Sequence, residues 1–210
     1  MSSPDFLSVL RTRRVVAIVR GHDPDAARDT VVTLVRSGID LVEVSLSGTD
    51  ALRVIARARK VLGPDAHLGA GTVLTTDDAR RAAEAGASYT VTPGVTDAVA
   101  ASHALGLPVL AGALTPTEVV AALAEGATAV KLFPAGPGGV DLLRALRGPF
   151  PDVPFVPVGG IDARAARDHL AAGALAVGVG GPLVGRAADG DPRGLDERIE
   201  AFRSLALEMS

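Results

Sequence analysis

The sequence predicts a (β/α)8 barrel, a TIM-type barrel, with an additional helix at each end. Eight short apolar segments alternate with helical stretches rich in alanine, arginine and leucine. The segments are continuously apolar, which is typical of parallel strands buried on both faces, and short loops connect them. An open doubly wound sheet is the alternative, but no glycine-rich dinucleotide fingerprint follows the first predicted strand.

The predicted elements follow one another along the whole chain. A first helix is expected over residues 4–13, with Ser3 as its cap before Pro4. The strands are expected at residues 15–20, 40–46, 67–71, 88–92, 108–112, 128–133, 154–158 and 174–180. The helices after them are expected at residues 23–38, 50–62, 76–85, 95–105, 116–125, 139–147, 162–172 and 192–209. Glycines at 38, 86, 126 and 173 each stand where a helix would end in a left-handed residue before a strand, which supports this assignment.

Length and composition limit the kind of protein. The 210 residues, of which 48% are hydrophobic, can bury one large core, so we expect a single domain over residues 1–210. A formal net charge of −3 and only five phenylalanines and one tyrosine argue against a nucleic-acid partner. Without cysteine there are no disulfides or thiolate metal sites. No apolar segment has the length of a membrane span or signal core, so we expect no membrane partner and a soluble, cytoplasmic protein.

One lysine lies inside a predicted apolar strand. Lysine occupies only two of the 21 Lys and Arg positions, Lys60 and Lys131, and Lys131 stands between Val130 and Leu132. A desolvated amine can lose its proton and attack a carbonyl carbon, which a guanidinium cannot do. Lys131 is therefore a candidate for Schiff-base chemistry. The alternative is a lysine that extends to solvent at the strand end or pairs with a carboxylate.

A glutamate lies inside another predicted strand. Glu43 stands between Val42 and Val44, where burial would raise the pKa of its carboxyl toward neutrality. Such a group can take and return protons during imine formation and carbon–carbon cleavage. The alternative is a buried ion pair of Glu43 with Lys131 or Arg20.

Glycine-rich loops follow the seventh and eighth predicted strands. They read VGGID at residues 158–162 and GVGGPL at residues 178–183. In a barrel the active site lies at the carboxyl ends of the strands, and these two loops often bind phosphate through backbone amides and helix N-termini. The alternative is that the glycines only permit tight turns. No basic residue stands in either loop, so Arg20 is the candidate cation for an anion bound there.

These motifs together resemble one enzyme family over about residues 6–186. The motifs, in order, are IVRG at 18–21, LVEVSL at 41–46, GAGTVL at 69–74, VTPG at 91–94, LTPTE at 114–118, VKLFPA at 130–135, GPFP at 148–151, VPVGGID at 156–162 and AVGVGG at 176–181. This order is similar to the KDPG/KHG aldolases, class I enzymes that cleave 2-keto-3-deoxy-6-phosphogluconate or 4-hydroxy-2-oxoglutarate. The resemblance implies a keto-acid substrate, pyruvate as a product, no metal or other cofactor, and a homotrimer.

The resemblance also implies roles for individual residues. Lys131 would form the Schiff base, Glu43 would be the general acid and base, and Thr72 would hold the pyruvate carboxylate. Arg20 would line the substrate site. The residues implied to shape the pocket are Thr92, Pro93 and Phe133, and those implied to form the phosphate loops are Gly159, Gly160, Gly180 and Gly181.

Three positions depart from the family pattern. Ser47 stands near where some members carry an arginine for the substrate carboxylate. Val158 and Gly181 replace a threonine and a serine, so two hydroxyl donors are lost. The resemblance implies 2-keto-3-deoxy-6-phosphogluconate as the expected substrate, and these departures leave 2-keto-3-deoxy-6-phosphogalactonate or 4-hydroxy-2-oxoglutarate as alternatives. A phosphate-binding barrel isomerase or synthase and a non-catalytic sugar-acid binder are more distant alternatives.

Overall fold

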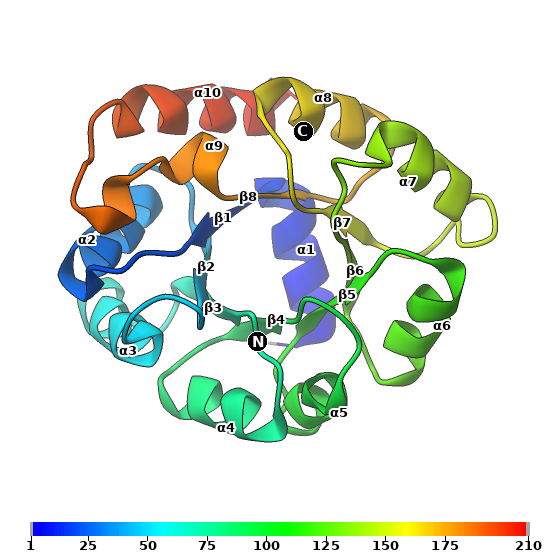
Figure 1. The fold of residues 1–210 in the computed structure, drawn as a ribbon, viewed down its shortest axis with the longest axis horizontal. Coiled ribbons are helices and arrows are strands. Elements are labelled where there is room, and N and C mark those ends of the chain that lie inside the picture. Colours follow the sequence, from blue (N-terminus) through cyan, green and yellow to red (C-terminus); the bar gives the residue numbers. More distant parts are fainter. Residues whose placement is uncertain (1, 209–210) are drawn as a thin grey trace.

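The structure, a computed structural model, describes residues 2–208 and contains a ring of eight parallel strands surrounded by helices (Figure 1). The strands are β1 (Val15–Val19), β2 (Leu41–Ser45), β3 (His67–Gly71), β4 (Tyr89–Val91), β5 (Val109–Ala113), β6 (Ala129–Leu132), β7 (Phe155–Pro157) and β8 (Val177–Val179). Consecutive strands pair from β1 to β7, and β8 pairs with β1. A single bridge between Val158 and Gly178 joins the two ends of the sheet, so the barrel is nearly closed and the predicted fold class is confirmed.

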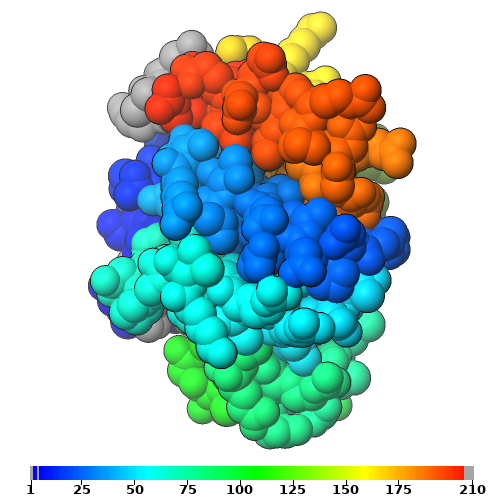
Figure 2. Space-filling view, turned by 90° about the vertical axis from the view of Figure 1, so that its left-hand side faces the viewer, coloured from blue at the N-terminus to red at the C-terminus, as the bar shows by residue number. Residues whose placement is uncertain are grey.

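Most of the helices connect one strand to the next around the outside of the ring, while the first helix precedes β1 and the last three follow β8. They are α1 (Ser3–Arg13), α2 (Pro24–Arg36), α3 (Ala51–Leu62), α4 (Thr76–Glu84), α5 (Asp97–Ala104), α6 (Pro116–Ala124), α7 (Gly139–Arg147), α8 (Ala163–Ala171), α9 (Gly181–Val184), the 3-10 helix η1 (Ala187–Asp189) and α10 (Leu195–Glu208). Figure 2 shows α2, α3 and α4 as successive bands on one face, with the C-terminal part of the chain beside α2. None of the helices within residues 2–208 is long and apolar enough to span a membrane.

The predicted helix ends were largely correct, because the four junction glycines have the expected conformation. Their φ angles are 92°, 91°, 87° and 93° at Gly38, Gly86, Gly126 and Gly173, which is the left-handed region. The predicted N-terminal cap of the first helix was wrong, because the side chain of Ser2, not Ser3, accepts the hydrogen bond that caps α1. Ser2 is favoured because Asp5, at the third helical position, bonds back to its backbone N–H in a capping box.

The prediction was also wrong in detail after β7. Strand β8 begins at residue 177 rather than 174, and the short helices α9 and η1 were not expected. The last helix begins at Leu195 rather than residue 192, because Pro192 accepts a turn hydrogen bond from the Leu195 N–H and Gly194 is left-handed at φ 67°. The predicted end of that helix, Met209, lies outside the described residues.

The amino-terminal end of the barrel is closed by α1. Figure 1 shows α1 lying across the ring of strands. Phe6 and Leu10 of α1 are fully buried, and the ring of Phe6 lies 4.8 Å from that of Tyr89, centroid to centroid. Large apolar side chains thus fill this end of the barrel interior, and the opposite end lies at the carboxyl ends of the strands. We call that end the mouth.

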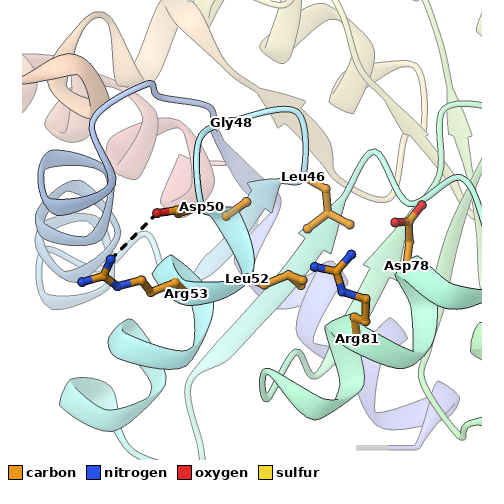
Figure 3. A pocket seen from close by; sticks show the side chains of 8 residues that line it. Leu46, Gly48, Asp50, Leu52, Arg53, Asp78 and Arg81 are labelled. Atoms are coloured by element: carbon orange, nitrogen blue, oxygen red, sulfur yellow. Dashed lines mark ion pairs between the residues drawn. The ribbon is translucent and has the colours of Figure 1, made fainter.

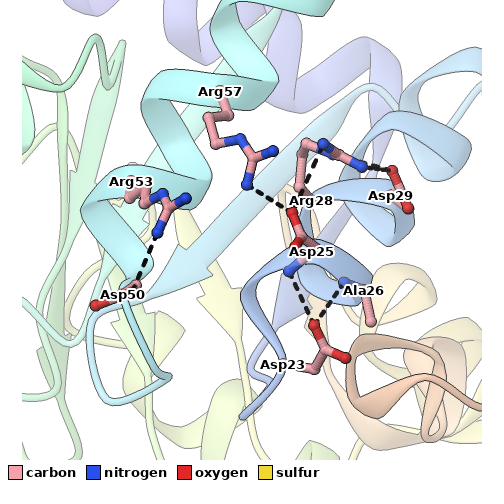
Figure 4. Close-up of polar contacts among 8 residues, drawn as sticks. All are labelled: Asp23, Asp25, Ala26, Arg28, Asp29, Asp50, Arg53 and Arg57. Carbon is pink, nitrogen blue, oxygen red and sulfur yellow. Dashed lines mark hydrogen bonds and ion pairs between the residues drawn. The ribbon is translucent and has the colours of Figure 1, made fainter.

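Polar contacts link the start of α2 to α3 (Figure 4). The Asp23 carboxylate caps α2 by accepting hydrogen bonds from the N–H groups of Asp25 and Ala26, at 2.9 and 3.1 Å. Asp25 in turn pairs with Arg57 of α3 and with Arg28 of its own helix. The Asp25 carboxylate is exposed and the two arginines are partly buried, so we expect these ion pairs to orient the two helices more than to stabilise the fold.

Candidate active site at the mouth of the barrel

Lys131 lies on β6 and its side chain is buried in the barrel. Only 6% of the residue is exposed, and its Nζ atom lies 5.0 Å from the centroid of the Phe133 ring. Among residues 2–208, Lys131 forms no ion pair, so the interpretation as one half of a salt bridge does not hold for this structure. The amine thus lies inside the barrel next to the face of the Phe133 ring, and that ring lines the cavity at the mouth.

Glu43 lies on β2 and is also buried in the barrel, with 3% of the residue exposed. It stands in register with Ile18 of β1 and Gly69 of β3. Burial raises the pKa of the Glu43 carboxyl above its ordinary value, and the positive charges of Lys131 and Arg20 offset part of that rise. The acid and the amine therefore influence each other electrostatically, although no ion pair between them is found in the described part of the chain.

Three hydroxyl groups and one guanidinium meet at the carboxyl end of β2, the strand that carries Glu43. The Oγ atom of Ser45, at the end of β2, lies 2.9 Å from Thr72 Oγ1 and 2.8 Å from Ser47 Oγ. It also accepts a hydrogen bond of 3.4 Å from Nε of Arg20. The structure thus brings together Arg20 and Thr72, which the sequence singled out. Ser45, the residue that links them, received no role from the sequence, although its position at a strand end on the Glu43 face was the available signal.

Thr72 adopts an unusual backbone conformation. Its φ is 59°, in the left-handed region that β-branched residues rarely occupy. Such a conformation costs free energy and persists only where the surrounding structure enforces it, which is common at binding sites. In this conformation the Thr72 hydroxyl lies within hydrogen-bond distance of Ser45 Oγ.

The glycine loops after β7 and β8 form one cavity of about 410 Å³ at the mouth. Its lining includes Arg20, Phe133, Val158, Gly159, Gly160, Gly180 and Gly181. Gly159 and Gly160 have φ angles of 95° and 74°, so this turn needs residues without a Cβ. The cavity therefore brings the four predicted phosphate-loop glycines next to Arg20 and to the aromatic ring that neighbours Lys131.

Thr92 and Pro93 hold the loop after β4 in place. The Thr92 hydroxyl donates to the carbonyl of Gly94 at 2.7 Å and accepts from the N–H of Gly112 at 3.3 Å. A side chain at position 112 would overlap the carbonyl group of Pro93. Both residues thus fix the loop against β5, and neither is among the residues that line the glycine-loop cavity.

A second hollow lies on the outside of the barrel between α3 and α4 (Figure 3). It measures about 430 Å³ and contains none of the predicted site residues. Its charged groups are already engaged: Arg53 pairs with Asp50 at 3.8 Å, and Asp78 accepts a hydrogen bond of 3.0 Å from the Thr75 N–H in the capping box of α4. The outer hollow shares no lining residue with the glycine-loop cavity.

The fold and the mouth define a class of (β/α)8-barrel proteins with a buried amine, a buried acid and a glycine-lined cavity at one end. A family model described as "Aldolase: KDPG and KHG aldolase" matches residues 6–192. The chain belongs to this aldolase family and is a lyase.

Named relatives agree with this assignment. A probable 2-dehydro-3-deoxy-6-phosphogalactonate aldolase of Rhizobium meliloti is 38% identical over 176 residues, covering 81% of this chain and 82% of the relative. The KHG/KDPG aldolase of Escherichia coli K12 is 36% identical over 169 residues, covering 78% of each chain. A solved structure of a KDPG aldolase from Legionella pneumophila, with pyruvate captured as a covalent carbinolamine, is 26% identical, has a TM-score of 0.82 and covers 97% of each chain.

Proposed function

We propose that this aldolase is a class I enzyme, in which Lys131 forms a Schiff base with the 2-keto group of a 2-keto-3-deoxy-6-phospho sugar acid. The observation that carries the proposal is the burial of one amine and one carboxyl in the same barrel interior, close enough for the charge of Lys131 to influence the pKa of Glu43. The carbinolamine in the Legionella relative supports the same chemistry, since a carbinolamine is the first adduct of an amine with a ketone.

The first half of the proposed reaction forms an iminium, which can later accept the electron pair of the broken carbon–carbon bond. The free amine of Lys131 attacks the keto carbon, and a proton moves from nitrogen to the new alkoxide to give a carbinolamine. Protonated Glu43 then donates its proton to the carbinolamine hydroxyl, which leaves as water, and a positively charged iminium remains. Burial suits Glu43 to this step because the raised pKa of its carboxyl keeps a protonated fraction available.

The second half breaks the carbon–carbon bond. The Glu43 carboxylate accepts the proton of the hydroxyl on the fourth carbon, directly or through a water molecule. The bond between the third and fourth carbons breaks, its electron pair moves to the iminium, and glyceraldehyde 3-phosphate leaves. The remaining enamine takes a proton on its terminal carbon, and water hydrolyses the imine to pyruvate and the free amine of Lys131.

Substrate binding would be divided between the two sides of the mouth. We assign the carboxylate of the keto acid to the hydroxyls of Thr72 and Ser47 and to Arg20, which Ser45 links together. The phosphate would bind the backbone N–H groups of the glycine loops after β7 and β8. Phe133, Thr92 and Pro93 would shape the space between.

The gluconate isomer of the substrate is the first candidate, and one observation favours the galactonate isomer as the second. Val158, which lines the glycine-loop cavity, offers no hydroxyl to the substrate, and the Rhizobium relative carries a phosphogalactonate name. The two isomers differ in the configuration of the fourth carbon, which bears the hydroxyl that is deprotonated. A single hydrogen bond there is worth about 0.5–1.5 kcal/mol, enough for a several-fold preference.

The substrate is tested by measuring pyruvate release with lactate dehydrogenase as the coupling enzyme. We expect turnover of a 6-phosphorylated isomer to exceed that of its unphosphorylated counterpart and of 4-hydroxy-2-oxoglutarate. Val158→Thr should shift the ratio of the two phosphorylated isomers toward the gluconate. No pyruvate from any of these compounds would favour a barrel isomerase or synthase, or a binding protein, and would contradict the proposal.

Assembly and location are further parts of the proposal. We propose a cytoplasmic homotrimer, as the family resemblance implies, and several exposed apolar side chains are available for subunit contacts, among them Leu74, Leu114, Val120 and Leu123. Light scattering after size-exclusion chromatography should give three times the 21.2 kDa chain mass. A monomeric mass at micromolar concentration would contradict the proposed trimer but would leave the proposed Schiff-base mechanism unaffected.

A further inference from the structure

The hydroxyl group of Tyr89 is buried without a hydrogen-bond partner. Tyr89, the one tyrosine of the chain, is fully buried on β4, and its ring packs on Phe6 of α1. Phenylalanine would fill the same space without burying a polar atom. A buried hydroxyl that makes no hydrogen bond is unfavourable, so its presence in the barrel core calls for an explanation.

The Tyr89 phenol and the Glu43 carboxylate both pack against β3, at glycines two residues apart. A side chain at Gly69 of β3 would overlap the end of the Tyr89 ring, and one at Gly71 would overlap the Glu43 carboxylate. Gly69 and Gly71 face the barrel interior two residues apart, so their α-carbons are about 7 Å apart along the strand. The phenol therefore ends on the α1 side of the carboxylate, with no side chain of β3 between them.

The charges around the carboxylate fit this placement. Burial and then the negative charge of Glu43 raise the pKa of Tyr89 well above its ordinary value, so the phenol keeps its proton and can only donate it in a hydrogen bond to an anion. The other charged groups that act on Glu43 are Lys131 from β6 and Arg20 from the end of β1. Burial lowers the pKa of His67, which precedes Gly69 by two residues on β3, and the charged groups that act on it are Asp40, Arg13, Arg59 and Asp65 rather than Glu43.

We propose that Tyr89 is a positioning residue for Glu43, whose ionised carboxylate is hydrogen-bonded to the phenol through one bridging water molecule. This inference rests on the proposed role of Glu43 as acid and base. A donor beneath the carboxylate favours its ionised form, which opposes the effect of burial and brings the group closer to the state needed to accept a proton. It also holds the carboxylate from below while its other side faces the mouth.

The test measures the pKa of Glu43 directly by carbon-13 NMR of protein labelled at the glutamate carboxyls, with the Glu43 signal assigned by its loss in Glu43→Gln. Tyr89→Phe should raise that pKa by up to about one unit, since a hydrogen bond to the charged form is lost. Thr90→Val is the matched control, because Thr90 is the next residue on β4, carries another buried hydroxyl without a partner, and faces the opposite side of the strand. It should leave the pKa of Glu43 unchanged.

The inference would be overturned if the pKa of Glu43 were the same in Tyr89→Phe as in the unsubstituted protein. It would also be overturned if Thr90→Val raised that pKa as much as Tyr89→Phe does. If Tyr89→Phe fails to fold, Gly69→Ala displaces the phenol and should give the same upward shift; no shift there would also overturn it. The titration needs no turnover, so it stands apart from the proposed function. That function fails instead if the pH dependence of pyruvate release is the same with and without the Glu43 carboxyl.

Discussion

The carboxylate of Glu43 fills the space that a side chain at position 71 would occupy. Glu43 pairs in register with Gly69, and Gly71 lies two residues nearer the mouth, so the glutamate side chain leans along the strand direction toward the open end. Glycine is needed at position 71 because a larger residue would overlap the Glu43 carboxylate, and not because the backbone there adopts a conformation that only glycine allows.

Replacement of Gly71 by alanine tests this relationship. The added methyl group would push the carboxylate away, and a displacement of about 1 Å in a reacting group can lower turnover on the order of 100-fold. Gly148→Ala, at the end of α7 with an ordinary φ of −56°, is the control and should retain activity. Steady-state pyruvate release measures both, and unchanged turnover in Gly71→Ala would show that the carboxylate works equally well elsewhere.

Glu43→Gln should separate catalysis from stability. Turnover should fall by about 10²–10⁴-fold because glutamine cannot exchange protons. The fold, by contrast, should gain stability at neutral pH. Since burial raises the pKa of Glu43, the folded protein holds a proton that the unfolded chain loses, and the free energy of unfolding therefore falls as pH rises from the ordinary carboxyl range through the raised pKa.

Urea unfolding between pH 4 and pH 8 measures this effect. The variant should be the more stable protein above the pKa of Glu43, and the difference should disappear at the acidic end, where both side chains are neutral. A variant less stable than the unsubstituted protein at pH 8 would mean that attraction to Lys131 and Arg20 outweighs the cost of burial.

Substitution of Thr72 should affect substrate binding more than it affects the stability of the fold. Thr72→Gly removes a left-handed β-branched residue, so the stability should change by less than about 1 kcal/mol, the relief of strain offsetting the added freedom of the unfolded chain. The Michaelis constant for the keto acid should nevertheless rise several-fold with loss of the hydroxyl. Thr72→Ser keeps the hydroxyl and should bind substrate normally; a normal Michaelis constant in the glycine variant would remove Thr72 from the carboxylate site.

The phosphate loop can be tested with two glycines of matched conformation. Gly160 and Gly106 have φ angles of 74° and 73°, but Gly160 lines the mouth cavity while Gly106 ends α5 with no atom near its missing side chain. Alanine at either position should destabilise the fold by about 1–2 kcal/mol. Only Gly160→Ala should raise the Michaelis constant for phosphorylated substrates, with little change for unphosphorylated ones. Equal effects on both substrates would place the phosphate elsewhere.

Local sequence patterns were sufficient to predict the fold and the placement of Lys131 and Glu43 inside buried strands. A lysine or a glutamate inside an apolar strand can be recognised from the sequence without knowing how the strands pair, and the junction glycines mark the helix ends. The link from Arg20 through Ser45 to Thr72, and the position of Tyr89 beneath Glu43, depend instead on the relative register of four strands and on which small residues make room. Those relationships appear only when the barrel is assembled. The short helices after β8 were missed because their few residues carry no periodic signal.

The most direct test of the account is borohydride reduction in the presence of pyruvate, followed by mass spectrometry of the peptides. Reduction of an imine with pyruvate should add a stable covalent adduct to the peptide that contains Lys131, and Lys131→Arg should abolish it. Lys60→Arg, which removes the only other lysine, should leave it intact. No adduct, or an adduct on Lys60, would contradict the assignment of Lys131 as the Schiff-base lysine.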